Sequence, residues 1–247
     1  MIDIHCHILP NFDDGSRNMK MTLEMGRQAF ENNVAKIVST SHYSCTAEDT
    51  DFVEKRNGLI EQVRENFRQN SVNVEIYPGA EVYLNDDIYY DYELEKLTIN
   101  NTRYILCELS FFDLTLNKIM RYFDELVSRK LVPILAHPER YEYFQQDYSL
   151  VNQLADMGTL FQINMTSLAG IDSEESYILA TKMVENGMAS FLATDAHSTG
   201  LRNMKTLSFI NLFPPVLDDE SFYRLVERNP QRVLNGEPVR TRFNHIR

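Results

Sequence analysis

Short apolar runs recur along the chain and predict seven strands. Each run holds four to six residues and is rich in β-branched or aliphatic side chains, which is typical of strands buried inside a protein. The predicted strands are residues 1–4, 35–40, 74–77, 104–109, 132–136, 160–163 and 190–193.

Stretches with helical periodicity separate most of these strands. Between 116 and 127 the apolar residues recur at i, i+3, i+4 and i+7, which predicts a helix that packs one face against a sheet. Two of the other stretches end at Gly158 and Gly187, and glycine is favoured just after a helix C-terminus. The predicted helices are residues 52–67, 116–127, 150–157 and 178–184.

This alternation predicts the fold class. Strands that alternate with helices form parallel βα units, and seven such units favour an α/β fold with barrel-like closure. The chain has 247 residues and contains no internal repeat, low-complexity segment or Pro/Gly/Ser-rich linker. We therefore expect a single domain over residues 1–247.

Composition and charge narrow the function classes. The net charge of −12 argues against a nucleic-acid-binding surface, which needs a basic patch. No apolar run reaches the roughly 18 residues of a membrane span, and residues 1–3 do not resemble the start of a signal peptide. The three cysteines form no C-x-x-C pair, so the simplest interpretation is reduced thiols in a cytoplasmic protein.

The first predicted strand leads into two histidines, His5 and His7. Side chains two residues apart on an extended chain project from the same face. Two imidazoles held in this way can bind one divalent metal ion. By themselves they remain a weak signal, because extended His-x-His pairs also occur by chance.

Other side chains that can bind metal also lie where a predicted strand ends. They lie at or just after the carboxyl ends of later predicted strands, and only the sixth strand lacks one, with Asn164 there instead. In a (β/α) barrel these ends converge on the face that carries the chemistry. Five of the six histidines in the chain fall there, and we expect His245, in the polar tail, to be solvated. The further candidates are His42, Glu81, Glu108, His137, Asp195 and His197.

Each candidate also has an ordinary structural interpretation. His42 can be a hydrogen-bonded core histidine, and Glu81 can face the N-terminus of a helix. His137 can simply end a strand before a proline, and Asp195 with His197 can be a loop pair. Their joint placement at one end of successive strands favours a multinuclear metal site instead.

The number of candidates exceeds what one metal ion can use. Glu108 lies inside an apolar strand, where a carboxylate needs a partner or a metal. Four or five imidazoles with three or four carboxylates suit two or three divalent ions that share a bridging carboxylate. Such a mixed ligand set suits manganese, iron(II) or zinc better than calcium.

These motifs together resemble the PHP (polymerase and histidinol phosphatase) superfamily, and more closely its CpsB/YwqE-type branch. The resemblance covers nearly the whole chain, to the Asn-Pro-Gln-Arg-Val-Leu segment at 229–234. The motifs that carry it are His5-Cys6-His7, Asp13-Asp14-Gly15-Ser16, His42, Gly79-Ala80-Glu81-Val82-Tyr83, Glu108, His137-Pro138-Glu139-Arg140-Tyr141 and Asp195-Ala196-His197.

The resemblance implies a trinuclear site on a distorted seven-stranded (β/α)7 barrel of the TIM-like PHP fold. It implies three ligand groups, and all nine positions hold the expected residue type. The groups are His5, His7, Glu81 and Asp195 for one ion, Glu81, Glu108 and His137 for a second, and Asp14, His42 and His197 for a third.

Two arginines complete the candidate site. Arg140 follows His137 by three residues and Arg202 follows His197 by five, and guanidinium groups bind phosphate in bidentate fashion. An ordinary surface salt bridge is the alternative for Arg202. The similar family places phosphate-contacting arginines at both positions.

The resemblance implies a metal-dependent protein-tyrosine phosphatase. Its expected substrate is phosphotyrosine on a bacterial autophosphorylating tyrosine kinase that regulates capsular or exopolysaccharide synthesis. The expected chemistry is direct hydrolysis, because no cysteine is followed six residues later by the arginine of a cysteine-phosphatase loop. The alternatives are a small-molecule phosphatase of the histidinol-phosphate type and a non-catalytic metal-binding regulator.

Nearby aromatic residues leave two interpretations open. They can line a pocket for phosphotyrosine, or they can be ordinary packing at the rim of the barrel. The residues concerned are Tyr43, Phe111, Phe112 and Tyr141.

Overall fold

The computed structural model describes residues 1–45, 51–91, 93–112 and 114–247. It confirms all seven predicted strands, with ends that shift by at most two residues. They are β1 (Ile2–Cys6), β2 (Lys36–Ser39), β4 (Glu75–Pro78), β6 (Tyr104–Glu108), β7 (Val132–Ala136), β8 (Leu160–Asn164) and β9 (Ala189–Ala193).

Two further strands are present that the sequence pattern did not predict. β3 (His42–Tyr43) and β5 (Glu81–Tyr83) hold two and three residues, which is too short to produce a period-two pattern. β3 follows β2 after two residues, and β5 follows β4 after Gly79 and Ala80. Each pair is therefore one chain segment with a break in its hydrogen bonding.

The strands form two parallel sheets. One has the order β1-β2-β4 and the other the order β3-β5-β6-β7-β8-β9, and all of the pairings between these strands are parallel. An isolated parallel bridge between Cys6 and Ala196 connects the end of β1 to the segment after β9. The strands therefore form two separate hydrogen-bonded sheets, whereas seven βα units were expected to form one continuous sheet. A closed seven-stranded barrel stays a prediction.

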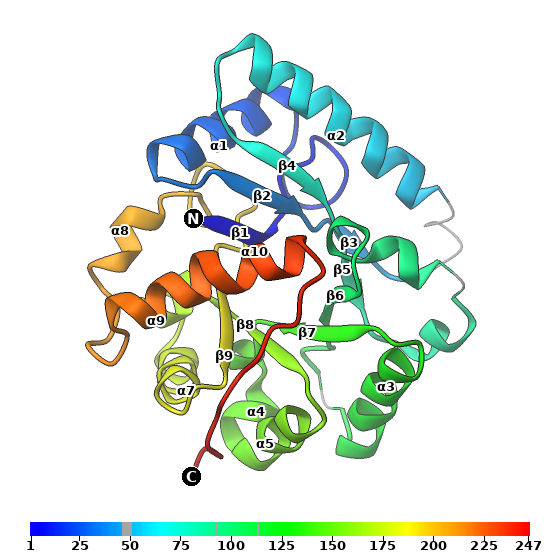
Figure 1. Cartoon of the computed structure of the whole chain (residues 1–247), viewed down its shortest axis with the longest axis vertical. Coiled ribbons are helices and arrows are strands. Elements are labelled where there is room, and N and C mark those ends of the chain that lie inside the picture. Colours follow the sequence, from blue (N-terminus) through cyan, green and yellow to red (C-terminus); the bar gives the residue numbers. More distant parts are fainter. Residues whose placement is uncertain (46–50, 92, 113) are drawn as a thin grey trace.

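Helices surround the strands, which occupy the centre of the view in Figure 1. The four predicted helices are confirmed as α2, α3, α5 and α7, and positive φ angles at Gly158 and Gly187 end two of them as expected. The helices are α1 (Met19–Glu31), α2 (Phe52–Gln69), α3 (Leu116–Ser128), α4 (Glu142–Gln146), α5 (Tyr148–Asp156), α6 (Met165–Leu168), α7 (Glu174–Glu185), α8 (Thr206–Ile210), α9 (Asp219–Tyr223) and α10 (Asn229–Leu234).

Short irregular helices connect these elements. Within the described residues, four have 3₁₀ geometry: η2 (Asp86–Tyr90), η3 (Leu94–Leu97), η4 (Ile99–Asn101) and η5 (Pro138–Arg140). A π-helical turn, η6 (Arg224–Arg228), joins α9 to α10. No helix in the part of the chain that the structure describes is both long and apolar enough to cross a membrane.

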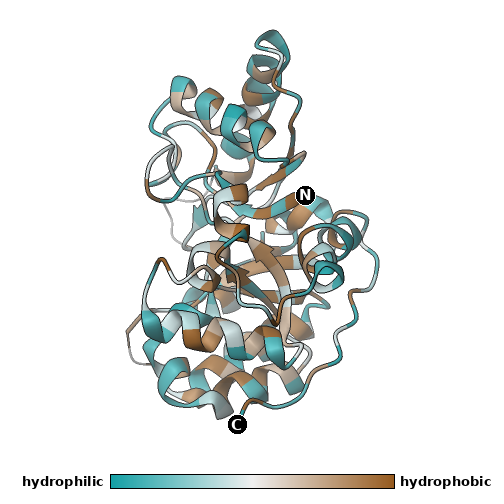
Figure 2. Cartoon of the chain, turned by 90° about the vertical axis from the view of Figure 1, so that its left-hand side faces the viewer, coloured by the Kyte–Doolittle hydropathy of each residue, from teal (hydrophilic) through white to brown (hydrophobic). Residues whose placement is uncertain are grey.

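The apolar core leaves one end of the strands free for polar residues. Ile2 and Ile4 of β1 pack with Val233 and Leu234 of α10, so α10 covers the strands near their amino-terminal ends (Figure 1). In Figure 2 the interior strands are brown, while much of the outer helix surface is teal. Because the strands are parallel, their carboxyl ends point to the same side, away from α10.

Candidate metal centre

β1 brings His5 and His7 to the centre of the molecule. Both side chains are fully buried, and their Nε2 atoms lie 3.3 Å apart. The loop after β1 fits tightly around this position, because a Cβ atom on Gly15 would lie 2.2 Å from the backbone oxygen of His7. The first strand therefore holds two imidazole nitrogens at a fixed, short separation.

Glu81, at the start of β5, lies between several of these imidazoles. One oxygen, Oε1, is 2.9 Å from His137 Nε2. The other, Oε2, is 3.1 Å from Nε2 of both His5 and His7 and 3.3 Å from His42 Nδ1. One buried carboxylate thus lies among four histidines that come from three strand ends, because β1 supplies both His5 and His7.

Asp195 has a similar position on the opposite side of the histidine pair. Its Oδ1 lies 3.3 Å from His5 Nε2, 3.6 Å from His7 Nε2 and 3.5 Å from His197 Nδ1. Its backbone is left-handed, with φ of 52°, a conformation that costs free energy in a residue other than glycine. The segment is held in place because the Asp195 N–H donates to His5 O at 2.9 Å.

The outer part of the cluster contains His42, His197 and Asp14. Asp14 Oδ1 is 3.4 Å from His42 Nε2 and 3.3 Å from His197 Nε2. Glu108, the last residue of β6, is 3.0 Å from His42 Nδ1. Asp14 is exposed and His42 partly exposed, whereas the rest of the cluster is buried, so the site opens to solvent on this side.

Several buried atoms at the centre have no hydrogen-bond partner. They include Glu81 Oε2, Asp195 Oδ1 and His197 Nε2. A buried polar atom without a partner is costly, and a buried charge more so. These atoms converge within a few ångströms of imidazole nitrogens, as ligands around a cation do. Their mixed imidazole and carboxylate character fits manganese, iron(II) or zinc.

The carboxylates also control the protonation of the histidines. Burial lowers the pKa of His5, but the charges of Glu81 and Asp195 outweigh it and raise this pKa to about 9. Burial is likewise outweighed at His7, where Asp13 and Glu81 raise the pKa to about 9. The negative charge of the carboxylates thus favours positive charge at the centre. When no metal is bound, the protonated imidazoles of His5 and His7 supply it.

Four overlapping groups of these side chains have the geometry to hold a metal ion. All nine residues predicted as ligands occur in these groups, so the structure brings the whole predicted set together. The groups are His7, Asp14, His42 and His197; His5, His7 and Glu81; His5, His137 and Asp195; and His42, Glu81 and Glu108. They overlap with the implied ligand groups without matching them one to one, and the assignment of ligands to ions stays a prediction.

Arg140 and Arg202 lie at the mouth of the cluster. Both donate to Asp195 Oδ2, Arg140 at 3.4 Å, and the Asn164 amide donates to the same oxygen at 2.9 Å. These donors hold the outer oxygen of Asp195 and leave Oδ1 directed at the histidines. Both guanidinium groups are partly exposed, so they can also reach a ligand in solvent.

A hollow of about 450 Å³ lies beside Arg202. It includes Asp14 and His197 from the cluster, together with Arg17 and Ser198. The cluster is therefore accessible from the surface next to an arginine, which is where a phosphorylated ligand would enter.

Two residues that were not predicted, Asp13 and Gln162, orient His7 and His5. Asp13 Oδ2 is 2.8 Å from His7 Nδ1, and Gln162 Oε1 is 2.6 Å from His5 Nδ1. Such partners fix the ring orientation of metal-binding histidines. Gln162 could have been recognised, because it shares the inward face of β8 with Asn164, two residues later. Asp13 stands in a polar loop and gave no separate signal.

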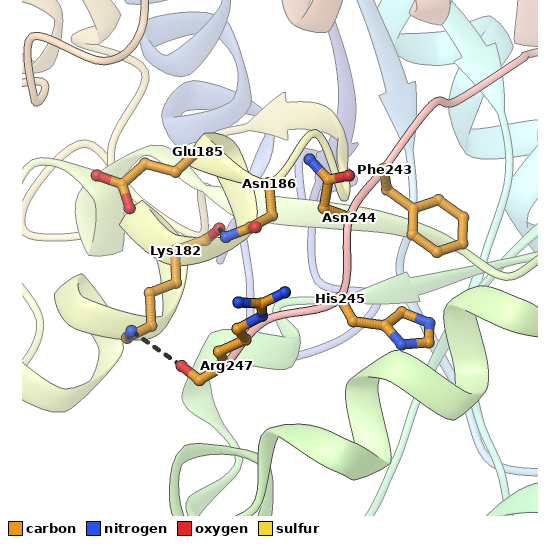
Figure 3. A pocket seen from close by; sticks show the side chains of 7 residues that line it. All are labelled: Lys182, Glu185, Asn186, Phe243, Asn244, His245 and Arg247. Atoms are coloured by element: carbon orange, nitrogen blue, oxygen red, sulfur yellow. Dashed lines mark hydrogen bonds between the residues drawn. The ribbon is translucent and has the colours of Figure 1, made fainter.

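The cysteines and the remaining histidine lie apart from this chemistry. Cys6 and Cys107 are buried free thiols, and burial raises the pKa of Cys6 well above its usual value, which is consistent with a packing role. His245 lies beside a different hollow of about 690 Å³, between α7 and the C-terminal residues (Figure 3).

Comparison with known proteins identifies the family. Residues 1–235 match the family described as capsular polysaccharide synthesis, CpsB/CapC, and the chain belongs to this family. It is 29% identical over 244 residues to tyrosine-protein phosphatase YwqE of Bacillus subtilis, covering 97% of this chain and 93% of that protein. It is 32% identical over 245 residues to tyrosine-protein phosphatase CpsB of Streptococcus pneumoniae, covering 97% and 100%.

A solved structure agrees with this assignment. The structures of YwqE from Bacillus subtilis and CpsB from Streptococcus pneumoniae are described as unique metal-dependent tyrosine phosphatases. The match has a TM-score of 0.86 and 28% sequence identity, and it covers 98% of this chain and 97% of the other. The fold is therefore shared over nearly its full length.

Proposed function

We propose that this member of the CpsB/CapC family is a metal-dependent tyrosine-protein phosphatase, a hydrolase of phosphoric monoesters. Its substrate is phosphotyrosine on a bacterial tyrosine kinase of the same polysaccharide operon, and it regulates capsular or exopolysaccharide synthesis. Relatives of nearly equal length that are named tyrosine-protein phosphatases support this activity, and the family description supports the pathway.

The observation that carries the proposal is the set of converging ligand atoms without hydrogen-bond partners. Glu81 Oε2 and Asp195 Oδ1 are buried carboxylate oxygens that accept no well-formed hydrogen bond, and several imidazole nitrogens surround them at 3.1–3.6 Å. A purely structural cluster would satisfy these oxygens with hydrogen bonds. A site that binds divalent cations explains why it does not.

We propose that the cluster holds two or three divalent ions, with manganese the first candidate and iron(II) or zinc as alternatives. The nine ligand residues are His5, His7, Asp14, His42, Glu81, Glu108, His137, Asp195 and His197. Divalent ions bound there would lower the pKa of a coordinated water and neutralise charge on the phosphoryl group.

The protein's own residues bind and orient the substrate. Arg140 and Arg202 each present unused guanidinium N–H groups at the mouth, and these hold the phosphate oxygens of the ester. Asp195 keeps both arginines in place through its outer oxygen. The leaving phenol has a reference pKa of about 10, far below that of an alkyl alcohol, so tyrosine departs without a strong demand for a general acid.

The remaining parts of the proposal concern the setting of this activity. The two sheets act together as a distorted seven-stranded (β/α)7 barrel, and residues 1–247 form one catalytic domain. The buried free thiols of Cys6 and Cys107 suit a cytoplasmic location, which is where the kinase would present its phosphotyrosines.

Hydrolysis assays on two substrates test the proposal. We expect the purified protein to release phosphate from a phosphotyrosine peptide, to lose this activity after EDTA treatment, and to regain it with Mn²⁺. Histidinol phosphate should be a poor substrate. A matched experiment compares Fe²⁺ and Zn²⁺ at equal occupancy and identifies the metal that gives the highest kcat.

Three results would contradict the proposal in different ways. Equal kcat/KM on histidinol phosphate and the peptide would favour a small-molecule phosphatase. Full activity after removal of all metal would exclude a metal-dependent mechanism. Metal binding without hydrolysis of either substrate would favour a non-catalytic regulator.

A further inference from the structure

Phe111 lies at the mouth of the metal centre, three residues after Glu108. Its ring stacks beside the imidazole of His137, with 5.8 Å between centroids and 18° between planes. The guanidinium carbon of Arg140 lies 5.2 Å from the centre of the same ring. Phe111 therefore contacts one proposed metal ligand and one proposed phosphate-binding residue, while 45% of its surface stays exposed.

The buried side of this ring is held rigidly. Tyr141 is fully buried, its ring centroid lies 4.9 Å from that of Phe111, and its hydroxyl accepts the Leu109 N–H at 3.0 Å. This bond fixes the chain just before Phe111. Tyr141 thus supports the ring of Phe111 on one side, while 45% of the surface of Phe111 stays exposed.

The next residue shows what an ordinary exposed phenylalanine does here. Phe112 is 84% exposed, and among the residues that the structure describes it has no ring or cation contact, in contrast to Phe111. Single exposed apolar residues need no functional explanation, and Phe112 is one of them. Phe111 differs because it is anchored between groups of the proposed active site.

We propose that Phe111 forms the wall that contacts the aromatic ring of phosphotyrosine and selects aryl over alkyl phosphate esters. The inference rests on the proposed function and adds a residue that determines specificity. In phosphotyrosine one ester oxygen separates phosphorus from the ring, so a phosphate held by Arg140 places the substrate ring beside the arginine. Phe111 is the exposed aromatic side chain in contact with that guanidinium.

The chemistry of this wall suits an aromatic substrate. Aromatic pairs gain free energy from stacked or edge-to-face contact beyond that of apolar burial alone. The rigid support of Phe111 by Tyr141 avoids most of the entropy cost of ordering a mobile side chain. An alkyl phosphate such as phosphoserine lacks the ring and gains none of this contact.

The test compares Phe111→Ala with the neighbouring Phe112→Ala. Each variant is assayed with bound Mn²⁺ on phenyl phosphate and glycerol phosphate, and inorganic phosphate is used as a competitive inhibitor. We expect Phe111→Ala to lower the ratio of kcat/KM for phenyl phosphate to that for glycerol phosphate by about tenfold, chiefly through a higher KM for the aryl ester. We expect Phe112→Ala to leave this ratio within twofold of the original protein.

Inorganic phosphate separates this role from simple positioning of Arg140. Phosphate has no ring, so its inhibition constant should stay within about twofold in Phe111→Ala. A parallel loss of phosphate binding and of both substrates would show that Phe111 only supports the arginine, and would overturn the inference. Phe111→Leu should show a reduced ratio as well, because it restores apolar volume without an aromatic face.

The outcome also distinguishes the inference from the proposed function. If the original protein hydrolyses a phosphotyrosine peptide but Phe111→Ala keeps its aryl preference, the proposed function stands and the inference fails. If Phe112→Ala lowers the ratio of kcat/KM for phenyl phosphate to that for glycerol phosphate as much as Phe111→Ala does, the inference fails as well. If the original protein hydrolyses no aryl phosphate at all, both fail.

Discussion

Histidine and aspartate meet in two regions of this molecule, with opposite consequences. Near the C-terminus, His245 Nε2 lies 2.9 Å from Asp156 Oδ1, and both side chains are more than half exposed. In the metal centre, His7 Nδ1 lies 2.8 Å from Asp13 Oδ2, and both side chains are buried. The distances are nearly equal, so distance alone does not identify a functional pair.

Burial and the surrounding groups make the difference. Water surrounds the exposed pair, and such an ion pair contributes about 0–1 kcal/mol to stability. The hollow beside it is open and lined by polar and charged side chains such as Lys182 and Glu185, and Figure 3 shows Lys182 bonded to the backbone oxygen of Arg247. The buried pair of His7 and Asp13 lies beside Glu81 Oε2 and Asp195 Oδ1, which accept no well-formed hydrogen bond. Because these oxygens are buried, solvent water and dissolved salt do not balance their negative charge, and a bound cation is needed.

The largest expected effect comes from neutralising Glu81. Glu81→Gln keeps the shape of the side chain but removes the charge that four histidines approach. We expect loss of bound metal and a fall in kcat/KM of about a thousandfold or more, because metal catalysis supplies several kcal/mol. Metal content measured by elemental analysis, together with phosphotyrosine hydrolysis, checks this expectation.

Glu185→Gln is the matched control for that variant. Glu185 lies beside the C-terminal hollow and is exposed, so the same chemical change there should alter neither metal content nor rate. Normal activity in Glu81→Gln would show that the buried carboxylate has only a structural role, and the contrast between the two regions would disappear.

The sequence predicted the strands and the convergence of the candidate ligands better than it predicted the residues that support them, and metal binding by these candidates stays a prediction. The seven apolar runs and the convergence of strand ends depend on periodicity and parallel pairing, which short local patterns record. Left-handed backbone at His137 and Asp195 leaves no such pattern, because neither residue is a glycine. The break between β2 and β3 spans only two residues, Thr40 and Ser41, which is also too short to leave a periodic pattern.

No separate signal in the sequence marked Asp13, the hydrogen-bond partner of the candidate ligand His7. Asp13 and Asp14 are adjacent and chemically identical, yet Asp13 orients His7 while Asp14 lies between His42 and His197. Only the path of the loop decides which carboxylate enters the interior. Residue type thus predicts which side chains can bind metal, and the fold decides which of them support the ligands.

An intermediate effect is expected when the support of His7 is weakened. Asp13→Asn keeps an acceptor oxygen but loses the negative charge beside His7 Nδ1. Partners of this kind change metal affinity by about 10- to 100-fold, and we expect weaker Mn²⁺ binding in that range by isothermal titration calorimetry. The matched variant Asp156→Asn alters the exposed pair in the same way and should leave metal affinity unchanged. Equal effects of both variants would contradict the distinction drawn between the pairs.

The pH dependence of metal binding gives a graded effect. His5 and His7 have their pKa raised to about 9, above the value of about 6.5 in an unfolded chain. In the metal-free protein their stabilising contribution is therefore complete below about pH 6.5 and is lost as the pH rises through about 9. Metal requires the neutral imidazoles, so its affinity should rise in the same interval, by about tenfold per pH unit for each proton displaced.

Thermal unfolding with and without Mn²⁺ measures this effect directly. Between pH 6.5 and 8.5 we expect the increase in Tm caused by the metal to grow steadily. An increase in Tm that stays constant or shrinks over this range would mean that the histidines bind metal without releasing protons, contrary to the charge balance of the cluster.

The smallest effect is expected at His245. His245→Gln removes an imidazole that touches Asp156 and stacks near Phe243, with 6.2 Å between ring centroids. Because the pair is exposed, we expect the free energy of unfolding to change by less than about 1 kcal/mol, with metal content and kcat unaltered. Urea denaturation and the phosphotyrosine assay measure both quantities. A loss of metal or activity would show that the C-terminal segment is coupled to the candidate metal centre. Solvent exposure would then no longer distinguish His245 from the five histidines of that centre.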